Sequence, residues 1–161
     1  FSIEPEKLLK IGYVLHHNEA DRDTMPTYQR LIKKSRLNSV RKFINDDHGY
    51  FPNSIIISID TKKRLRFDLS EKQVDGAVAS LGILYLPQKY RSAYIIDGQH
   101  RLYGYSDSPY ANKNSIPVVA FENLDHQEQV RLFMEINENQ KSVPKRLRNL
   151  LNANVLWDSD K

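Results

Sequence analysis

The residue types best suited to chemistry stand in the segment YIIDGQHRLYG, residues 94–104. The apolar pattern changes from strand to helix at Asp97-Gly98, and a helix start presents unpaired backbone N–H groups to an anion. Gly98 permits a positive φ angle and a close approach of a ligand to the backbone. Arg101 offers a planar set of donors suited to phosphate oxygens, and His100 donates to phosphate or moves a proton near neutral pH. The segment therefore predicts a phosphate site.

Two interpretations of this segment stay open from the residues alone. In the first, Gln99 orients a water or bonds a base or sugar beside the phosphate, and Asp97 holds a metal ion or fixes His100 or Arg101. In the second, the segment is a strand–turn–helix junction without a ligand, in which Asp97 caps the helix and pairs with Arg101.

Length and composition limit the class of protein. The chain has 161 residues, which fits one domain, and it contains no cysteine. Disulfides, thiolate metal sites and cysteine nucleophiles are excluded, and we expect a cytoplasmic location without membrane contact because no apolar run reaches the roughly 18 residues of a span. We expect residues 1–161 to form a single domain that is a fragment of a longer protein. Residues 1–26 are then an N-terminal extension, and residues 144–161 begin a C-terminal helical region.

The distribution of charge is more informative than the net charge of +4. Residues 24–45 contain six basic side chains and no acidic one, and residues 139–157 contain four basic side chains and no acidic one. Such stretches attract polyanions, although they are also ordinary for solvated helix faces. The candidate nucleic-acid contacts are Arg30, Lys33, Lys34, Arg41, Lys145, Arg146 and Arg148.

Periodicity and turn residues predict the order of the elements. Helices are expected over residues 4–17, 27–44 and 123–140, the last capped by Asp125, and another begins at Pro144. Strands are expected over residues 51–60, 64–69, 81–87, 92–96 and 116–121, with the first two paired as a hairpin and residues 71–80 as a loop. This order describes an α+β domain with a small mixed sheet flanked by helices. The segment at residues 97–101 then lies at a strand-to-helix junction.

The chain resembles a known family in two blocks that occur in the same order. DGQHR followed by Gly104 is similar to the signature of the DGQHR-domain family, which includes the DndB-like regulators of DNA phosphorothioate modification. The downstream block FMEINENQKSVPKRL and the upstream segments YQR, RLNSVRKFI and FPNSIIIS also resemble that family. The resemblance covers the chain from about Tyr28 to Leu151.

A more remote resemblance is to the ParB/sulfiredoxin-like superfamily, which implies its fold. There a strand leads into Gly-Glu-Arg-Arg or Gly-Cys-His-Arg at a helix start that binds nucleotide phosphates, and Gly98, His100 and Arg101 match these positions. Gln99 replaces the Cys, so sulfiredoxin's sulfur chemistry is not implied. NENQK at residues 137–141 is similar to a ParB block that helps hold metal and nucleotide. A restriction-system family with Asp-Gly-Gln-Gln-Arg, linked to nucleotide hydrolysis, differs at His100.

The resemblance implies two functions in prokaryotic DNA modification and defence. One is binding of a nucleotide at the DGQHR motif, with hydrolysis of a nucleoside triphosphate and Mg²⁺ left open. The alternative is a DndB-like DNA-binding transcriptional regulator without enzymatic activity. For the first, the implied catalytic residues are Asp97, His100 and Arg101; the implied phosphate contacts are Gly98, Gln99, His100, Arg101, Asn137, Asn139, Gln140 and Lys141. The partners are thus nucleotide, DNA or both; metal ligands and oligomeric state are not assigned.

Overall fold

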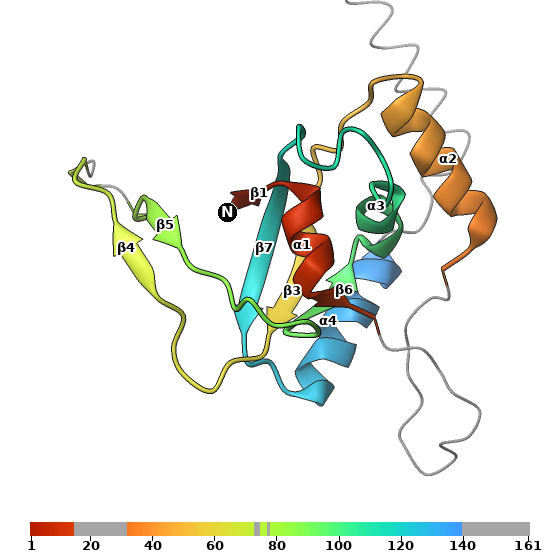
Figure 1. Cartoon of the computed structure of the whole chain (residues 1–161). Coiled ribbons are helices and arrows are strands. Elements are labelled where there is room, and N and C mark those ends of the chain that lie inside the picture. Colours follow the sequence, from red (N-terminus) through yellow and green to blue (C-terminus); the bar gives the residue numbers. More distant parts are fainter. Residues whose placement is uncertain (15–31, 73–74, 77, 140–161) are drawn as a thin grey trace, which may run out of the picture.

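The computed structural model describes residues 1–14, 32–72, 75–76 and 78–139. Within these residues the chain is mixed α+β, with a five-stranded mixed sheet, a two-stranded hairpin and four helices (Figure 1). The helices are α1 (Pro5–Ile11), α2 (Lys34–Asn45), α3 (Gln99–Gly104) and α4 (His126–Asn139). The strands are β1 (Ser2–Ile3), β2 (Gly12–Tyr13), β3 (Ile55–Ile59), β4 (Phe67–Leu69), β5 (Gly82–Leu84), β6 (Ala93–Asp97) and β7 (Ile116–Glu122).

The sheet has the strand order β1-β7-β3-β6-β2. β3 runs parallel to β7 and antiparallel to β6, while β1 pairs antiparallel with β7 and β2 pairs parallel with β6. The first 14 residues supply both edge strands, β1 and β2. The central strands are rich in isoleucine, a β-branched residue that suits a pleated sheet buried on both faces.

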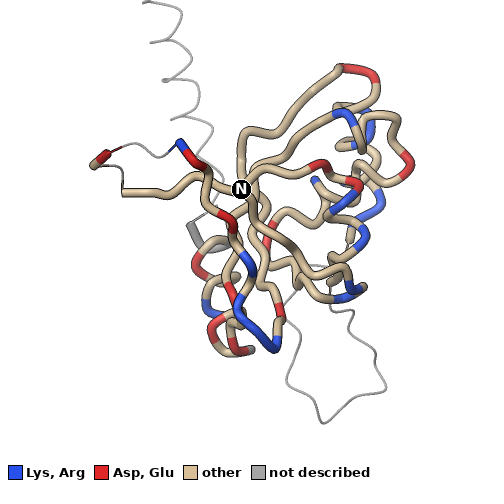
Figure 2. Tube along the Cα trace, turned by 60° about the vertical axis from the view of Figure 1, so that its left-hand side comes forward, with Lys and Arg blue, Asp and Glu red and all other residues tan. Residues whose placement is uncertain are grey.

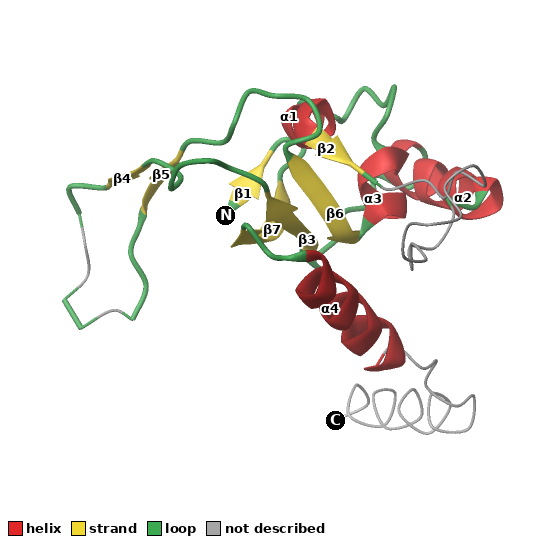
Figure 3. Ribbon diagram, turned by 90° about the horizontal axis from the view of Figure 1, so that it is seen from below, coloured by secondary structure: helices red, strands yellow, loops and turns green. Residues whose placement is uncertain are grey.

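Helices cover both faces of this sheet, with α1 on one face and α4 on the other (Figures 1 and 3). Ile57, Ile59 and Ile95 are fully buried in one core cluster together with Leu8 of α1 and Leu102 of α3. Burial of each such side chain contributes about 1.5–3 kcal/mol. This packing makes α3 a fixed element directly after β6.

α2 packs against α3 as an outer helix. The contact is close at Gly104, where a Cβ atom would lie 2.2 Å from Cγ1 of Val40. A side chain at this position would push α2 away from α3. Gly104 therefore lets α2, which carries basic side chains, lie next to the DGQHR segment.

Most predicted elements are confirmed, including the strands β3, β5, β6 and β7 and the described part of the loop between β4 and β5. The cap of α4 is also confirmed: the Glu128 backbone N–H donates to Oδ1 of Asp125 (2.8 Å), and the Asp125 N–H donates to Oε2 of Glu128 (3.2 Å). This reciprocal pair is a capping box, which satisfies N–H groups that the helix itself leaves unpaired.

Three predictions about elements need correction. The first helix ends at Ile11 rather than residue 17, because Gly12 and Tyr13 pair with β6. The described part of the second helix begins at Lys34, since Lys33 has extended backbone angles. Residues 64–69 do not form a hairpin with β3, because β3 is already hydrogen-bonded on both sides, to β6 and β7; β4 pairs with β5 instead. Pro144 and the helix predicted from it lie outside the described residues.

Among the described residues, no helix is both long enough and apolar enough to cross a bilayer.

Candidate functional site

The strand that leads into the motif carries a β-bulge at its last residues. Ile57 of β3 pairs with Ile95, but the preceding Ile56 pairs with Asp97, so Ile96 is an extra residue in β6. Ile95 packs in the main core, whereas Ile96 lines a pocket at the end of the strand. Bulges bend a strand and redirect its side chains, and they are common beside functional sites. The bulge thus sets the direction in which Asp97 leaves the sheet.

Gly98 forms the turn between β6 and α3. Its φ angle is +95°, in the left-handed region that favours glycine. A Cβ atom at this position would also lie 2.5 Å from Cδ1 of Ile55. Glycine is therefore required here by both the backbone angle and the close approach of β3, as the strand-to-helix pattern predicted. Because α3 has only six residues, its dipole adds little to anion binding. Side chains must therefore supply most of the attraction for an anion.

Arg101 holds the junction together through two contacts. Its Nη2 donates to Oδ2 of Asp97 at 2.9 Å, and its Nη1 donates to the backbone carbonyl of Asn53. The Arg101 and Asp97 side chains are mostly buried, with exposed fractions of 19% and 23%. The predicted ion pair is confirmed. The predicted cap is wrong: Gly98 is the N-cap of α3 and no side chain caps the helix, because the Asp97 carboxylate pairs with Arg101 instead.

His100 links the motif to the start of the basic helix. Its Nε2 accepts a hydrogen bond from the backbone N–H of Lys33 at 3.1 Å, and Lys33 is the residue immediately before α2. An accepting Nε2 carries no proton, so this contact requires a neutral ring with its proton on Nδ1. The side chain is half-buried between α3 and the segment that precedes α2.

These elements line an open pocket of about 370 Å³. Its lining comes from four separate parts of the chain: α2, the residue Asn53 before β3, the junction at residues 96–101, and α4. Arg36, His100 and Arg101 supply polar and cationic groups, whereas Val40, Ile96 and Phe133 supply an apolar wall. The complete described lining is Arg36, Val40, Asn53, Ile96, Asp97, Gly98, Gln99, His100, Arg101 and Phe133. Volumes of about 300–1,000 Å³ are usual for small-ligand sites.

Five lining residues were not predicted to belong to the site: Arg36, Val40, Asn53, Ile96 and Phe133. Arg36 belongs to the basic run that the sequence made visible, but nothing in its local pattern indicated that it reaches the motif. Asn53 lacked any signal, because it is its backbone carbonyl that meets Arg101.

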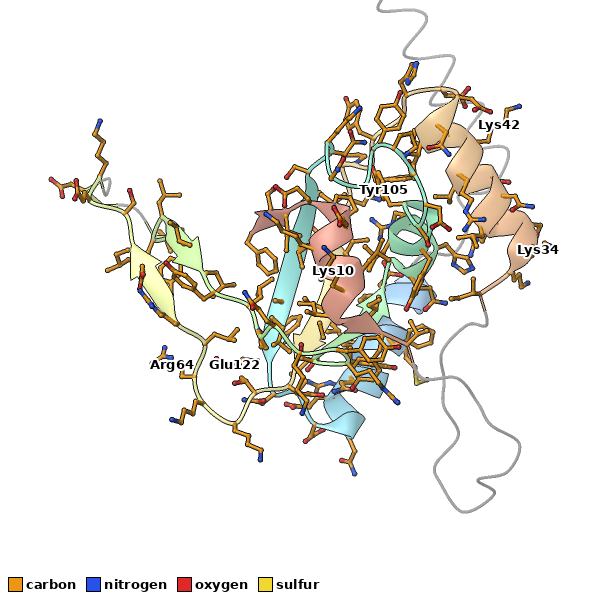
Figure 4. All side chains as sticks on the ribbon, in the orientation of Figure 1. Lys10, Lys34, Lys42, Arg64, Tyr105 and Glu122 are labelled. Carbon is orange, nitrogen blue, oxygen red and sulfur yellow. The ribbon has the colours of Figure 1, made fainter. Side chains whose placement is uncertain are left out.

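The exposed side of α2 is cationic. Lys33, Lys34, Arg36 and Lys42 are exposed, whereas Arg41 is partly buried. No residue of α2 is acidic. Lys34 and Lys42 point outward from the helix (Figure 4). Among the described residues, none of the four exposed cations has an ion-pair partner.

The remaining predicted contacts are only partly placed. Asn137 and Asn139 belong to the last turn of α4, and Asn137 stands one helical turn after the pocket residue Phe133. Arg30, Gln140, Lys141, Lys145, Arg146 and Arg148 lie outside the described residues. The convergence of residues 97–101 with residues 137–141 therefore stays a prediction. The described part of the chain contains no group of three or more His, Asp or Glu side chains arranged to hold a metal ion.

Comparison with known proteins identifies the class. A family model for DndB, described as DNA-sulfur modification-associated, matches residues 7–154. The match spans nearly the whole chain, so this protein belongs to the DndB family. No curated protein and no solved structure matches it. The ParB/sulfiredoxin-like fold therefore stays a prediction within the observed α+β class.

Proposed function

We propose that this chain binds DNA within a prokaryotic system for DNA sulfur modification. In this proposal, α2 lies along the phosphate backbone of the DNA, and the pocket at residues 97–101 binds a phosphoryl group. The observation that carries this proposal is the continuity of the two features through Arg36, which belongs to the basic side of α2 and also lines the pocket. Membership of the DndB family supports DNA as the partner. The role expected is that of a DNA-binding regulator.

The charge of α2 suits a phosphate backbone. Binding of DNA by exposed cations releases counterions, and affinity falls with salt by a logarithmic slope of about 0.9 for each phosphate neutralised. Among the described residues, the lysine and arginine side chains of α2 form no ion pair with an acidic side chain, so DNA binding would break none. Their contribution to binding should therefore appear almost entirely as a salt-dependent term.

The test is duplex binding by fluorescence anisotropy over a series of salt concentrations. Lys34→Glu combined with Lys42→Glu should weaken binding and lower the salt slope by roughly 1–2. The control is Lys62→Glu with Lys63→Glu, which changes two exposed lysines after β3, at the opposite end of that strand from Asn53. Equal affinity and slope in the α2 variant and the wild type would refute the proposal.

A second candidate is binding of a nucleoside triphosphate in the pocket, which its size and mixed lining favour. Arg36, His100 and the unused donors of Arg101 would contact the phosphates, while Val40 and Phe133 would contact the base. Asp97 is the one carboxylate of the described lining and is already paired with Arg101. The described residues thus do not form a Mg²⁺ site of their own, and any Mg²⁺ would be carried by the nucleotide. Hydrolysis stays a prediction from the resemblance.

Thermal shift with ATP, GTP, CTP and UTP, with and without Mg²⁺, tests this candidate. The informative variant is Arg36→Ala, because Arg36 lines the pocket and is exposed. Lys42→Ala on the same helix is the matched control. We expect a nucleotide-dependent rise in wild type and in the control, and its loss in Arg36→Ala. If no nucleotide shifts the wild type, this candidate fails while the DNA proposal stands.

A further inference from the structure

The hairpin of β4 and β5 projects away from the sheet and its helices (Figures 1 and 3). The two strands pair with each other and with no other described strand. An isolated two-stranded hairpin is marginal in water, and three strands or a packing partner are normally needed for stability. A hairpin of this kind is therefore expected to pack against something.

The hairpin exposes apolar side chains on both of its faces. Leu69, on one face, is 63% exposed, and Phe67 beside it is 42% exposed. Ile83, on the other face, is 62% exposed, and Leu81 is 60% exposed. The assignment to faces follows from the alternation of side chains along a strand. Exposed apolar side chains on a projecting element are typical of an interaction site. The face of Ile83 also carries Asp68, which is the cross-strand partner of Ile83 and is ion-paired with Arg66.

A cleft of about 1,110 Å³ separates this hairpin from α1 and β1. Its lining is largely apolar and includes Ile3, Ile11 and Leu84. The charged residues of the described lining are Lys7 and Lys10, both cationic. Each pairs with a glutamate of its own helical segment, and these exposed pairs are weak enough to exchange partners. The cleft thus suits an apolar strand with an acidic end.

The tip of the same hairpin supplies such an acidic end. Glu71 and Asp75 are exposed near the tip, with Lys72 between them, and red positions mark the tip in Figure 2.

We infer that the hairpin of one copy of this chain docks into the cleft of a second copy, and that the second hairpin returns the contact. The exchange buries the exposed apolar side chains of the hairpin and places Glu71 and Asp75 near Lys7 and Lys10 of the partner copy. Each copy offers the same hairpin and the same cleft, which is the condition for a closed two-fold dimer. This assembly does not depend on the proposed DNA or nucleotide function.

Sedimentation equilibrium over a range of concentrations tests the assembly. Wild type should dimerise, and Leu69→Asp combined with Ile83→Asp should raise the dimer dissociation constant at least tenfold. The control is Tyr50→Asp, which changes a side chain 76% exposed that lies before β3. It should dimerise as wild type does. A wild type that stays monomeric at all concentrations, or a dimer that survives the double substitution, would overturn the inference.

Disulfide trapping provides a second test that does not require the hairpin variant to fold. The chain has no cysteine, so introduced cysteines are the sole thiols. Lys10→Cys and Glu71→Cys proteins, mixed and oxidised, should form a cross-linked heterodimer. Lys10→Cys mixed with Lys42→Cys should not. Hydrogen exchange adds one more outcome: protection of the hairpin in a monomer would show that this chain covers it itself, and the inference would fail.

Discussion

Replacement of Arg101 by alanine should destabilise the fold, because the side chain joins three segments. It pairs with Asp97 at the end of β6 and donates to the carbonyl of Asn53 before β3. Both partners of the ion pair are mostly buried, so the substitution leaves the Asp97 carboxylate without its main counter-charge. Removal of one partner from a fully buried pair costs about 3–5 kcal/mol, and a hydrogen bond to a charged group contributes about 1.5–3 kcal/mol. For this partly exposed pair we expect about 2–3 kcal/mol.

Urea unfolding measures this effect as a change in the free energy of unfolding. For a chain of this length, 2–3 kcal/mol corresponds to a fall in Tm of roughly 4–12 °C. A double-mutant cycle with Asp97→Ala separates the ion pair from other losses, because the double variant should be less destabilised than the sum of the single variants. Asp97→Asn is the isosteric control for the carboxylate charge. An Arg101→Ala protein with wild-type stability, or single effects that simply add, would refute the idea that Arg101 clamps the junction.

Two further predictions concern the backbone turn and pH. Gly98→Ala should lower the free energy of unfolding by about 1–3 kcal/mol, because its φ of +95° strains any side chain; chemical denaturation checks this, and unchanged stability contradicts it. Burial and the nearby Asp60 carboxylate raise the pKa of Tyr13 to about 12, above its value of about 10 in the unfolded chain. The unfolded state therefore loses this proton first, so stability falls as pH rises from about 10 to about 12. Tyr13→Phe should flatten that fall, and an equally steep decline in the variant would show that other groups cause it.

Several features of the site were predictable from local sequence because their causes are local. The change of period at Asp97-Gly98 indicated a strand that runs into a helix, and the left-handed turn requires a glycine. The spacing of Asp97 and Arg101 brings an acid and a base within reach across the junction. The capping box of α4 likewise depends on two residues three positions apart. In each case the interacting groups are close in sequence, so the backbone geometry of one element decides the outcome.

The tertiary structure decided the other features of the fold and the site. These features depend on strand pairing and on contacts between distant segments. β3 pairs with β6 and β7, and this leaves β4 to pair with β5 in a hairpin that exposes apolar side chains. The bulge at Ile96 follows from the register between β3 and β6, which neither strand specifies alone. Arg36 reaches the pocket because α2 packs on α3 at Gly104, 68 positions further along the chain. The sequence by itself thus determined the motif and its turn, whereas packing of separate elements determined which side chains surround it.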